Sequence, residues 1–122
     1  MSHLVTIQSK LTDSNAVAAA CARLNLPTPV NGKAKLFSSE VTGLLVQLPS
    51  WQYPVVIDTR SGEVKFDNFE GHWGKKENLD LFLQMYAVEK AKLEARKKGY
   101  TVTEQTINDG SIKLQIIEGA KS

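Results

Sequence analysis

His72 is the clearest candidate for acid–base chemistry in this chain, because two carboxylates, Asp67 and Glu70, lie close to it in the sequence. An imidazole titrates near neutral pH, and a neighbouring carboxylate can hold it in the orientation that a general base needs. No serine, cysteine or threonine lies in a glycine turn typical of a nucleophile. His72 can equally be a loop histidine bonded to the backbone, so catalysis by His72 with Asp67 or Glu70 is the alternative hypothesis and not the first.

Metal, disulfide and phosphate chemistry have little support in the sequence. His3 is the second histidine, and neither histidine has the spacing to further ligands that is typical of a metal site. Cys21 is the one cysteine, which excludes an intrachain disulfide and a zinc site built from cysteines. Its alanine-rich surroundings favour a buried, unreactive thiol. The glycines form no phosphate-binding loop. We therefore expect no catalytic, cofactor-binding or metal-binding residues.

Basic residues between positions 90 and 98 are the candidate for nucleic-acid contact. Glu89 and Glu94 interrupt them and can pair with Lys92 and Lys98 at helical spacing. The formal net charge of the whole chain is only +2. We expect a solvated helix end, with nucleic-acid binding as a third and weaker hypothesis.

Three large aromatic residues, Trp51, Tyr53 and Trp73, lie outside the segments with clear periodicity. Aromatic side chains in loops can anchor a partner, because they bury much area at little entropic cost. They can also simply plug the end of a sheet. Together with His72 they are the candidate interaction surface.

The composition indicates one soluble globular domain over residues 1–122, with 42% hydrophobic and 23% charged residues. No segment approaches the roughly 20 apolar residues of a membrane span. The first residues lack the basic start and apolar run of a signal peptide. We expect a cytoplasmic protein with no membrane contact.

The first half of the chain predicts short strands around one helix. Thr12 or Asp13 can cap a helix that presents Val17, Cys21 and Leu24 on one face and ends before Pro27. An Asn31–Gly32 turn is expected next. The strands expected here are Leu4–Gln8, Lys35–Phe37, Val41–Leu48 and the hairpin Val55–Asp58 with Glu63–Phe66.

The second half predicts a long helix followed by a hairpin. The apolar stripe of the helix over 79–98 consists of Leu79, Phe82, Leu83, Tyr86 and Leu93. Gly99 ends the helix, and two strands then turn at 108–110. A three-residue loop sets Val102 opposite Ile116, whereas a two-residue loop sets it opposite Ile117. Together, the expected strands and helices predict a two-layer α+β domain, with a mainly antiparallel sheet and two helices packed on one face.

Several ordered motifs resemble a known family. They are Phe-Leu-Gln-Met-Tyr-Ala at 82–87, Lys-Lys-Gly-Tyr-x-Val at 97–102 and Asp-Gly-Ser-Ile-x-Leu at 109–114. Two further segments, 48–56 and 72–74, are more similar to the bacterial members of that family. The chain resembles a domain-of-unknown-function family that includes a small conserved reading frame of cyanobacteria and algal chloroplasts. Leu4 stands where algal members usually have phenylalanine. The resemblance implies no assigned functional residues, but an accessory role beside an AAA-type ATPase.

The function that the sequence favours is that of a small non-enzymatic binding or adaptor protein, acting through a protein partner or by self-association. The observations behind it are a complete core pattern, no recognisable catalytic set and the loop aromatics. The alternative is an enzyme, or an enzyme subunit, that uses His72 in a pocket.

Overall fold

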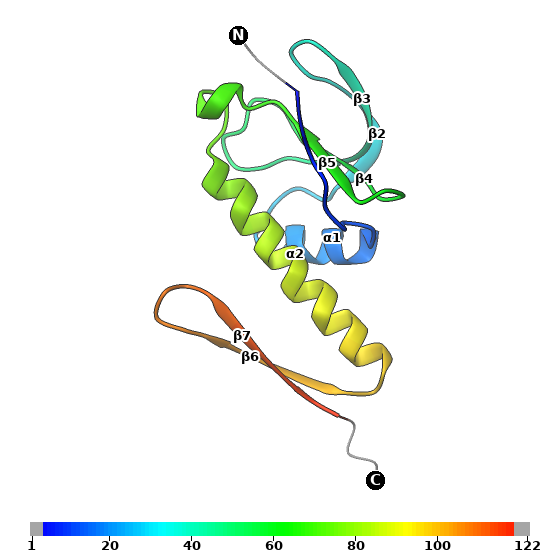
Figure 1. Cartoon of the computed structure of the whole chain (residues 1–122), viewed down its shortest axis with the longest axis vertical. Helices are drawn as coiled ribbons and strands as arrows, with labels where there is room; N and C mark the ends of the chain where they lie inside the picture. The colour runs from blue at the N-terminus through cyan, green and yellow to red at the C-terminus, as the bar shows by residue number, and fades with distance from the viewer. Residues whose placement is uncertain (1–3, 119–122) are drawn as a thin grey trace.

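A computed structural model describes residues 4–118 of the chain. The elements follow in the order β1 (Val5–Ile7), α1 (Ser14–Arg23), β2 (Val30–Lys35), β3 (Glu40–Val46), β4 (Val55–Asp58), β5 (Glu63–Phe66), a 3₁₀ turn η1 (Phe69–Gly71), α2 (Lys76–Lys97), β6 (Thr101–Thr106) and β7 (Ile112–Ile117). Figure 1 shows the sheet and α1 beside one half of α2, and the β6–β7 hairpin beside the other half. The predicted α+β class is confirmed.

Five antiparallel strands form the main sheet, in the order β1-β5-β4-β3-β2. The predicted hairpin of β4 and β5 is confirmed with both strand boundaries. Gly62 closes its turn at a φ of +83°, and a Cβ there would lie 2.6 Å from the Ser9 carbonyl oxygen. Only glycine fits both constraints.

The prediction of a turn at Asn31–Gly32 is wrong. Both residues lie inside β2, which pairs with β3 from Val30 to Lys35, and the chain reverses after Leu36, whose N–H donates to the Ser39 carbonyl. An Asn-Gly pair makes a hairpin turn only between two strands. The residues before it contain Pro27 and Pro29, which cannot supply a paired strand, so the hairpin forms further along the chain. The strand expected at Lys35–Phe37 overlaps β2 only at Lys35.

Asp13, and not Thr12, caps α1. Its carboxylate accepts hydrogen bonds from the N–H groups of Asn15 at 2.9 Å and Ala16 at 3.2 Å. The helix buries the expected face through Val17 and Cys21, while Leu24 packs against the core from a partly exposed position.

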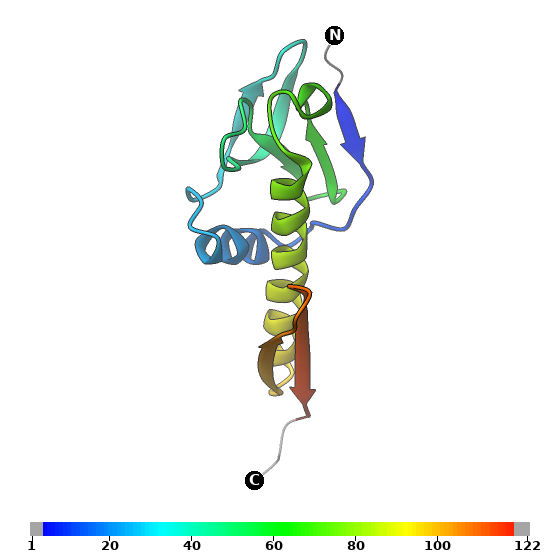
Figure 2. The same ribbon diagram turned by 90° about the vertical axis from the view of Figure 1, so that its left-hand side faces the viewer.

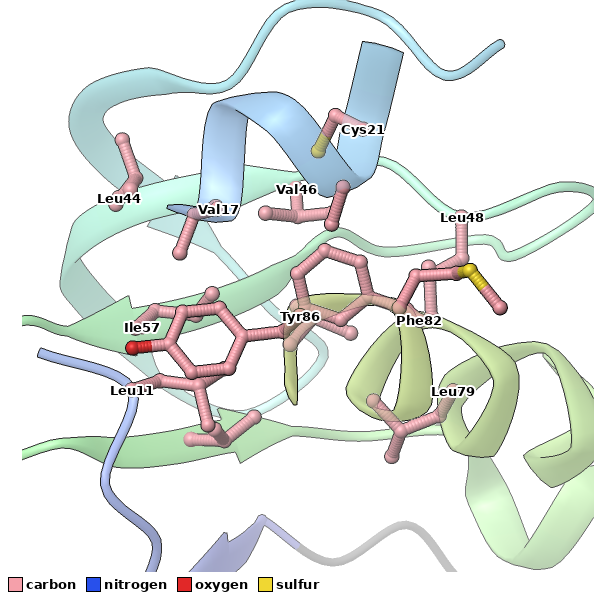
Figure 3. Packing of buried hydrophobic residues seen from close by; sticks show 14 of the residues in the cluster. Leu11, Val17, Cys21, Leu44, Val46, Leu48, Ile57, Leu79, Phe82 and Tyr86 are labelled. Atoms are coloured by element: carbon pink, nitrogen blue, oxygen red, sulfur yellow. The ribbon is translucent and has the colours of Figure 1, made fainter. Parts of the chain in front are cut away.

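Both helices cover one face of the sheet, which confirms the two-layer arrangement. Figure 3 shows Phe82 and Tyr86 projecting from α2, with Val17, Val46 and Cys21 across from them. Phe82 is fully buried. The sheet residues of this core are Leu44, Val46, Val55, Ile57, Val64 and Phe66. The opposite sheet face carries a smaller buried cluster of Ala34, Leu36 and Val56, against which Val41, Leu45 and Tyr53 pack.

The last two strands do not join the main sheet. They form a separate two-stranded sheet that contacts the C-terminal half of α2 (Figures 1 and 2). Val102 lies opposite Ile116, so the three-residue loop alternative is confirmed. Gly99 and Gly110 have φ values of +79° and +88°, the left-handed conformation expected where a helix stops and a hairpin bulges.

An ion-pair network ties this hairpin to the body. Arg23 of α1 contacts Glu89 of α2 at 2.9 Å and Glu104 of β6 at 2.5 Å, and Lys92 contacts Glu104 at 2.6 Å. These hydrogen bonds lower the pKa of the Glu104 carboxyl from 4.5 to about 2. The expected Glu89–Lys92 pair is present at 3.5 Å.

Glu94, the second carboxylate at the basic end of the helix, does not pair with Lys98 as expected. It contacts Lys90 at 3.0 Å and Lys97 at 3.6 Å, in place of Lys98. Lys90 also reaches the Asp13 cap at 3.2 Å. Much of the basic charge between positions 90 and 98 is therefore compensated within the chain.

Replacing Phe82 by alanine tests the core. We expect Phe82→Ala to lower the free energy of unfolding by about 3–5 kcal/mol, because it leaves a cavity where both helices meet the sheet. The neighbouring Leu81 is 43% exposed, so Leu81→Ala is the matched control and should change little. Denaturant unfolding measures both. Equal losses for the two variants would contradict the core described here.

Acid should weaken the attachment of the hairpin. Because the folded-state pKa of Glu104 is lowered, its contribution to stability is present above pH 4.5 and is lost as the pH falls toward 2. The protection factors of the β6 amides, which are corrected for the change of the intrinsic exchange rate with pH, should fall across this range in the wild type. In Glu104→Gln the acid-dependent part should be missing, and an unchanged acid response would show that the network does not hold the strand.

Candidate functional site

Five aromatic rings contact one another near η1 and the β2–β3 turn, two segments that lie at the end of the molecule away from the β6–β7 hairpin (Figure 1). They are Phe37, Tyr53, Phe69, His72 and Trp73, which we call the aromatic cluster. The Trp73 ring is central, with ring centroids 4.8 Å from Phe69, 5.2 Å from Phe37 and 5.5 Å from Tyr53. His72 stacks on Phe69 at 4.7 Å. The cluster holds three of the four residues predicted as an interaction surface.

Three separate segments supply these rings. Phe37 lies in the turn between β2 and β3, Tyr53 lies in the connection from β3 to β4, and the other three lie between β5 and α2. The Gln52 N–H donates to the Trp73 carbonyl at 2.8 Å, which joins the second and third segments. The cluster therefore depends on the sheet and on the start of α2 together.

The segment from Asp67 to Gly74 has a strained backbone. Phe69, Glu70 and Gly71 follow one another with φ values of +48°, +53° and +98°. A left-handed conformation costs a residue other than glycine roughly 1–2 kcal/mol. Strain of this kind persists only where the surroundings impose it, and it is concentrated at functional sites.

Buried polar groups hold the strained segment in place. The Asp67 carboxylate accepts from the Phe69 N–H at 3.1 Å. The Asn68 carbonyl accepts from Gly71 and Trp73, and its side-chain amide donates to the Gly74 carbonyl at 3.1 Å. Asp67 and Asn68 are the two buried polar residues of the part of the chain that the structure describes. The other carboxylate oxygen of Asp67, Oδ2, is buried with no hydrogen-bond partner among those residues.

Trp51 belongs to the core, which agrees with the interpretation that a loop aromatic plugs the end of the sheet and contradicts its place in the candidate interaction surface. Its side chain packs edge-on against Phe66, with ring centroids 5.6 Å apart, and it is only 5% exposed. Its Nε1–H donates to the Lys75 carbonyl at 3.0 Å, just before α2 begins. Gly74 lies directly against the ring. Trp51 thus fixes the end of the strained segment from inside.

Phe37 is the surface residue that sequence reasoning missed. It is 59% exposed, whereas Tyr53, Phe69 and Trp73 are half-buried. Its neighbour Leu36 is buried, and the next residues, Ser38 and Ser39, are typical of a turn. That local signal, an aromatic residue at the edge of a serine turn, identifies an exposed ring in retrospect.

His72 does not form the arrangement that a general base needs. Its ring is exposed, and among residues 4–118 it has neither a hydrogen bond nor an ion pair with Asp67 or Glu70. It borders a hollow of about 360 Å³ whose other lining residues are Ser50, Gly71, Gly74, Lys75 and Asn78. That lining contains no carboxylate.

The other chemistry-bearing residues of the described part of the chain give no second site. Within the described range, no three histidine, cysteine, aspartate or glutamate side chains lie close enough to hold a metal ion. Cys21 is buried as predicted, and burial raises the pKa of its thiol to about 11. Among the helices described, none has the length and apolar character needed to cross a membrane. His3 lies outside the described residues.

Comparison with protein-family models, with curated proteins and with solved structures finds no match to this chain. The family resemblance of its motifs therefore stays a prediction.

Gly74→Ala tests whether the packing of Trp51 holds the strained segment. A Cβ at position 74 would lie well inside van der Waals contact with the Trp51 ring, so the indole must shift away from the Lys75 carbonyl. We expect a loss of about 2 kcal/mol or more in unfolding free energy and a changed tryptophan fluorescence.

The matched control is Gly32→Ala, where the nearest atom to the new Cβ is a Leu45 methyl at 3.7 Å. It should be close to neutral. Indistinguishable unfolding curves for the two variants would show that Gly74 and Trp51 are not packed in this way.

Proposed function

We propose that the protein is a small non-enzymatic binding or adaptor protein whose contact surface for a protein partner is the aromatic cluster. The observation that carries this proposal is the exposed ring of Phe37 packed at a tilt against Trp73, beside a backbone segment held in a strained conformation.

Preorganised aromatic rings are well suited to binding a protein. Aromatic anchors dominate the energy of many interfaces, and a surface that is already ordered loses little entropy on binding. Trp73 contacts three rings of the cluster, so its orientation is set before a partner arrives. An exposed Phe37 gains apolar contact when a partner covers it.

A protein partner fits this surface better than a nucleic acid. Single-stranded nucleic acid is held by aromatic platforms combined with a basic groove. Here the basic end of α2 lies at the opposite end of the molecule from η1 and the β2–β3 turn, which carry rings of the aromatic cluster (Figure 1). Lys90, Lys92 and Lys97 are moreover paired with carboxylates.

The class of partner follows from the family resemblance. That resemblance implies an accessory role beside an AAA-type ATPase, and we propose an ATPase of this type as the partner to test first. A cytoplasmic location stays a prediction. The enzymatic alternative has one supporting observation, which is that His72 borders a hollow. It needs an orienting carboxylate from another chain.

Phe37→Ser is the test of the proposed function. The exposed ring contributes little to the fold, so the variant should remain folded while its affinity for the partner falls by about 30-fold or more, as expected for a central aromatic anchor. Val30→Ser is the matched control, because Val30 is also 59% exposed but lies at the far end of β2.

Affinity capture followed by titration of the purified partner measures both variants. The proposal predicts that Val30→Ser keeps the partner and Phe37→Ser loses it. Equal affinity of Phe37→Ser and the wild type for every recovered partner would refute the aromatic surface.

A further inference from the structure

The outer edge of β7 presents backbone groups that have no partner among residues 4–118. The Ile107 N–H donates to the Ser111 carbonyl at 3.0 Å, so the pair 107–111 is hydrogen-bonded. Antiparallel pairs alternate between bonded and non-bonded. In the register of this hairpin, the N–H and C=O groups of Ile112, Leu114 and Ile116 therefore point away from β6. Within residues 4–118 no third strand pairs with this edge.

The side chains do little to protect this edge. Natural edge strands are usually blunted by proline, bulges or several charges. β7 contains neither proline nor a bulge and has one charged residue, Lys113. Ile116 and Ile117 are 46% and 48% exposed. The opposite strand, β6, is rich in threonine and contains Glu104, so β7 is the apolar edge of the hairpin.

The side of α2 above this edge carries small apolar side chains, with Lys90, Glu94 and Lys98 beside them. Ile116 lines a hollow of about 260 Å³ with Ala91, Ala95 and Tyr100, whereas Glu104 of β6 is bound by Lys92 on another side of the helix. The side of α2 nearest the free edge is therefore the side of Ala91. A second apolar hollow, of about 480 Å³, continues from Ala91 along the helix past Ala87 and Leu83.

We propose that β7 pairs antiparallel with β7 of a second copy of this chain, around a two-fold axis at Leu114. The two hairpins then form one four-stranded sheet, and the two α2 helices lie side by side on the same face of it. This inference concerns a surface other than the aromatic cluster and does not depend on the proposed function.

The sequence of β7 is complementary to itself in this arrangement. Leu114 lies opposite Leu114 of the second copy, and Ile112 lies opposite Ile116, so apolar side chains meet on the helix-facing side. On the other side Lys113 lies opposite Gln115, and no like charges meet. In this register the hydrogen-bonded pairs are 112 with 116 and 114 with 114 of the second copy. The N–H and C=O groups of these residues are the ones that point away from β6 and are free to form the bonds.

The helix positions agree with the strand pairing. Strands lie about 4.8 Å apart, and α2 contacts both strands of its hairpin. Two helices, each centred over its own hairpin, are then separated by two strand spacings, or about 10 Å. Packed helices lie roughly 8–10 Å apart when small residues such as Ala87 and Ala91 form the contact.

A second copy fits this edge better than an unrelated strand. A two-fold pairing covers both apolar β7 edges in one closed contact, and each copy covers the α2 face of the other. An extended peptide from another protein would supply the strand but not the helix, so the Ala87–Ala91 side of α2 would stay exposed.

Changing the charge of Gln115 tests the pairing. Light scattering after size exclusion should show a dimer for the wild type. In the dimer, Gln115→Lys places a lysine opposite Lys113 of the second copy, and the two-fold axis repeats this like-charge pair. The variant should raise the dissociation constant of the dimer by about tenfold, while Gln115→Glu should lower it. Thr103→Lys adds the same charge on β6, directly opposite Gln115 within one chain, and should leave the dimer unchanged.

Amide exchange supplies a second readout of the register. The amides of Ile112, Leu114 and Ile116 should become protected as protein concentration rises. A monomer at every concentration, equal effects of Gln115→Lys and Thr103→Lys, or a dimer in which these three amides stay unprotected would overturn the inference. Because Phe37→Ser leaves β7 intact, it should not alter the dimer, so failure of one proposal is distinguishable from failure of the other.

Discussion

The packing of α2 is the interaction on which the rest of the structure depends. Its first half buries Leu79, Phe82 and Tyr86 between the sheet and α1, and its second half is the main support of the β6–β7 hairpin. A hairpin of two strands alone is marginally stable in water. Its position therefore follows from the apolar contacts of α2 and from the ion pairs of Glu104 with Arg23 and Lys92.

The start of α2 has an equally direct effect on the aromatic end. Lys75 immediately precedes the helix, and its carbonyl is held by the buried Trp51. The strained residues Phe69 and Glu70 lie between that fixed point and β5. The packing of the core thus offsets the conformational cost of the strained loop. In its strained conformation the loop holds the rings of Phe69, His72 and Trp73 together.

Local pattern was sufficient to predict the elements whose partners are close in sequence. The β4–β5 hairpin, the apolar stripe of α2 and the existence of the β6–β7 hairpin all follow from turn residues and periodicity, whereas the sequence left two registers open for that last hairpin. The Asn31–Gly32 turn failed because the choice between turns depends on which flanking segment can pair, and the prolines upstream remove that option. Hydrophobic periodicity does not show which of two flanking segments will pair with a strand.

The candidate site was harder to predict for a related reason. Trp51 and Trp73 both lie in irregular segments, and the contacts that bury Trp51 come from Phe66, Gly74 and Lys75, which are distant from it in the sequence. Phe37 joins the cluster from a turn whose position was itself mispredicted. Three segments meet there, and no local rule relates residues 37, 53 and 73.

The length of α2 has a consequence for the geometry of any assembly. A helix of 22 residues is about 33 Å long, and its two halves support different surfaces. A rod of this kind keeps the aromatic end well clear of the hairpin, so two hairpins joined about a two-fold axis would hold two aromatic ends apart and facing outward. Such a pair would be bivalent, and a partner with repeated binding sites would gain avidity from the spacing alone.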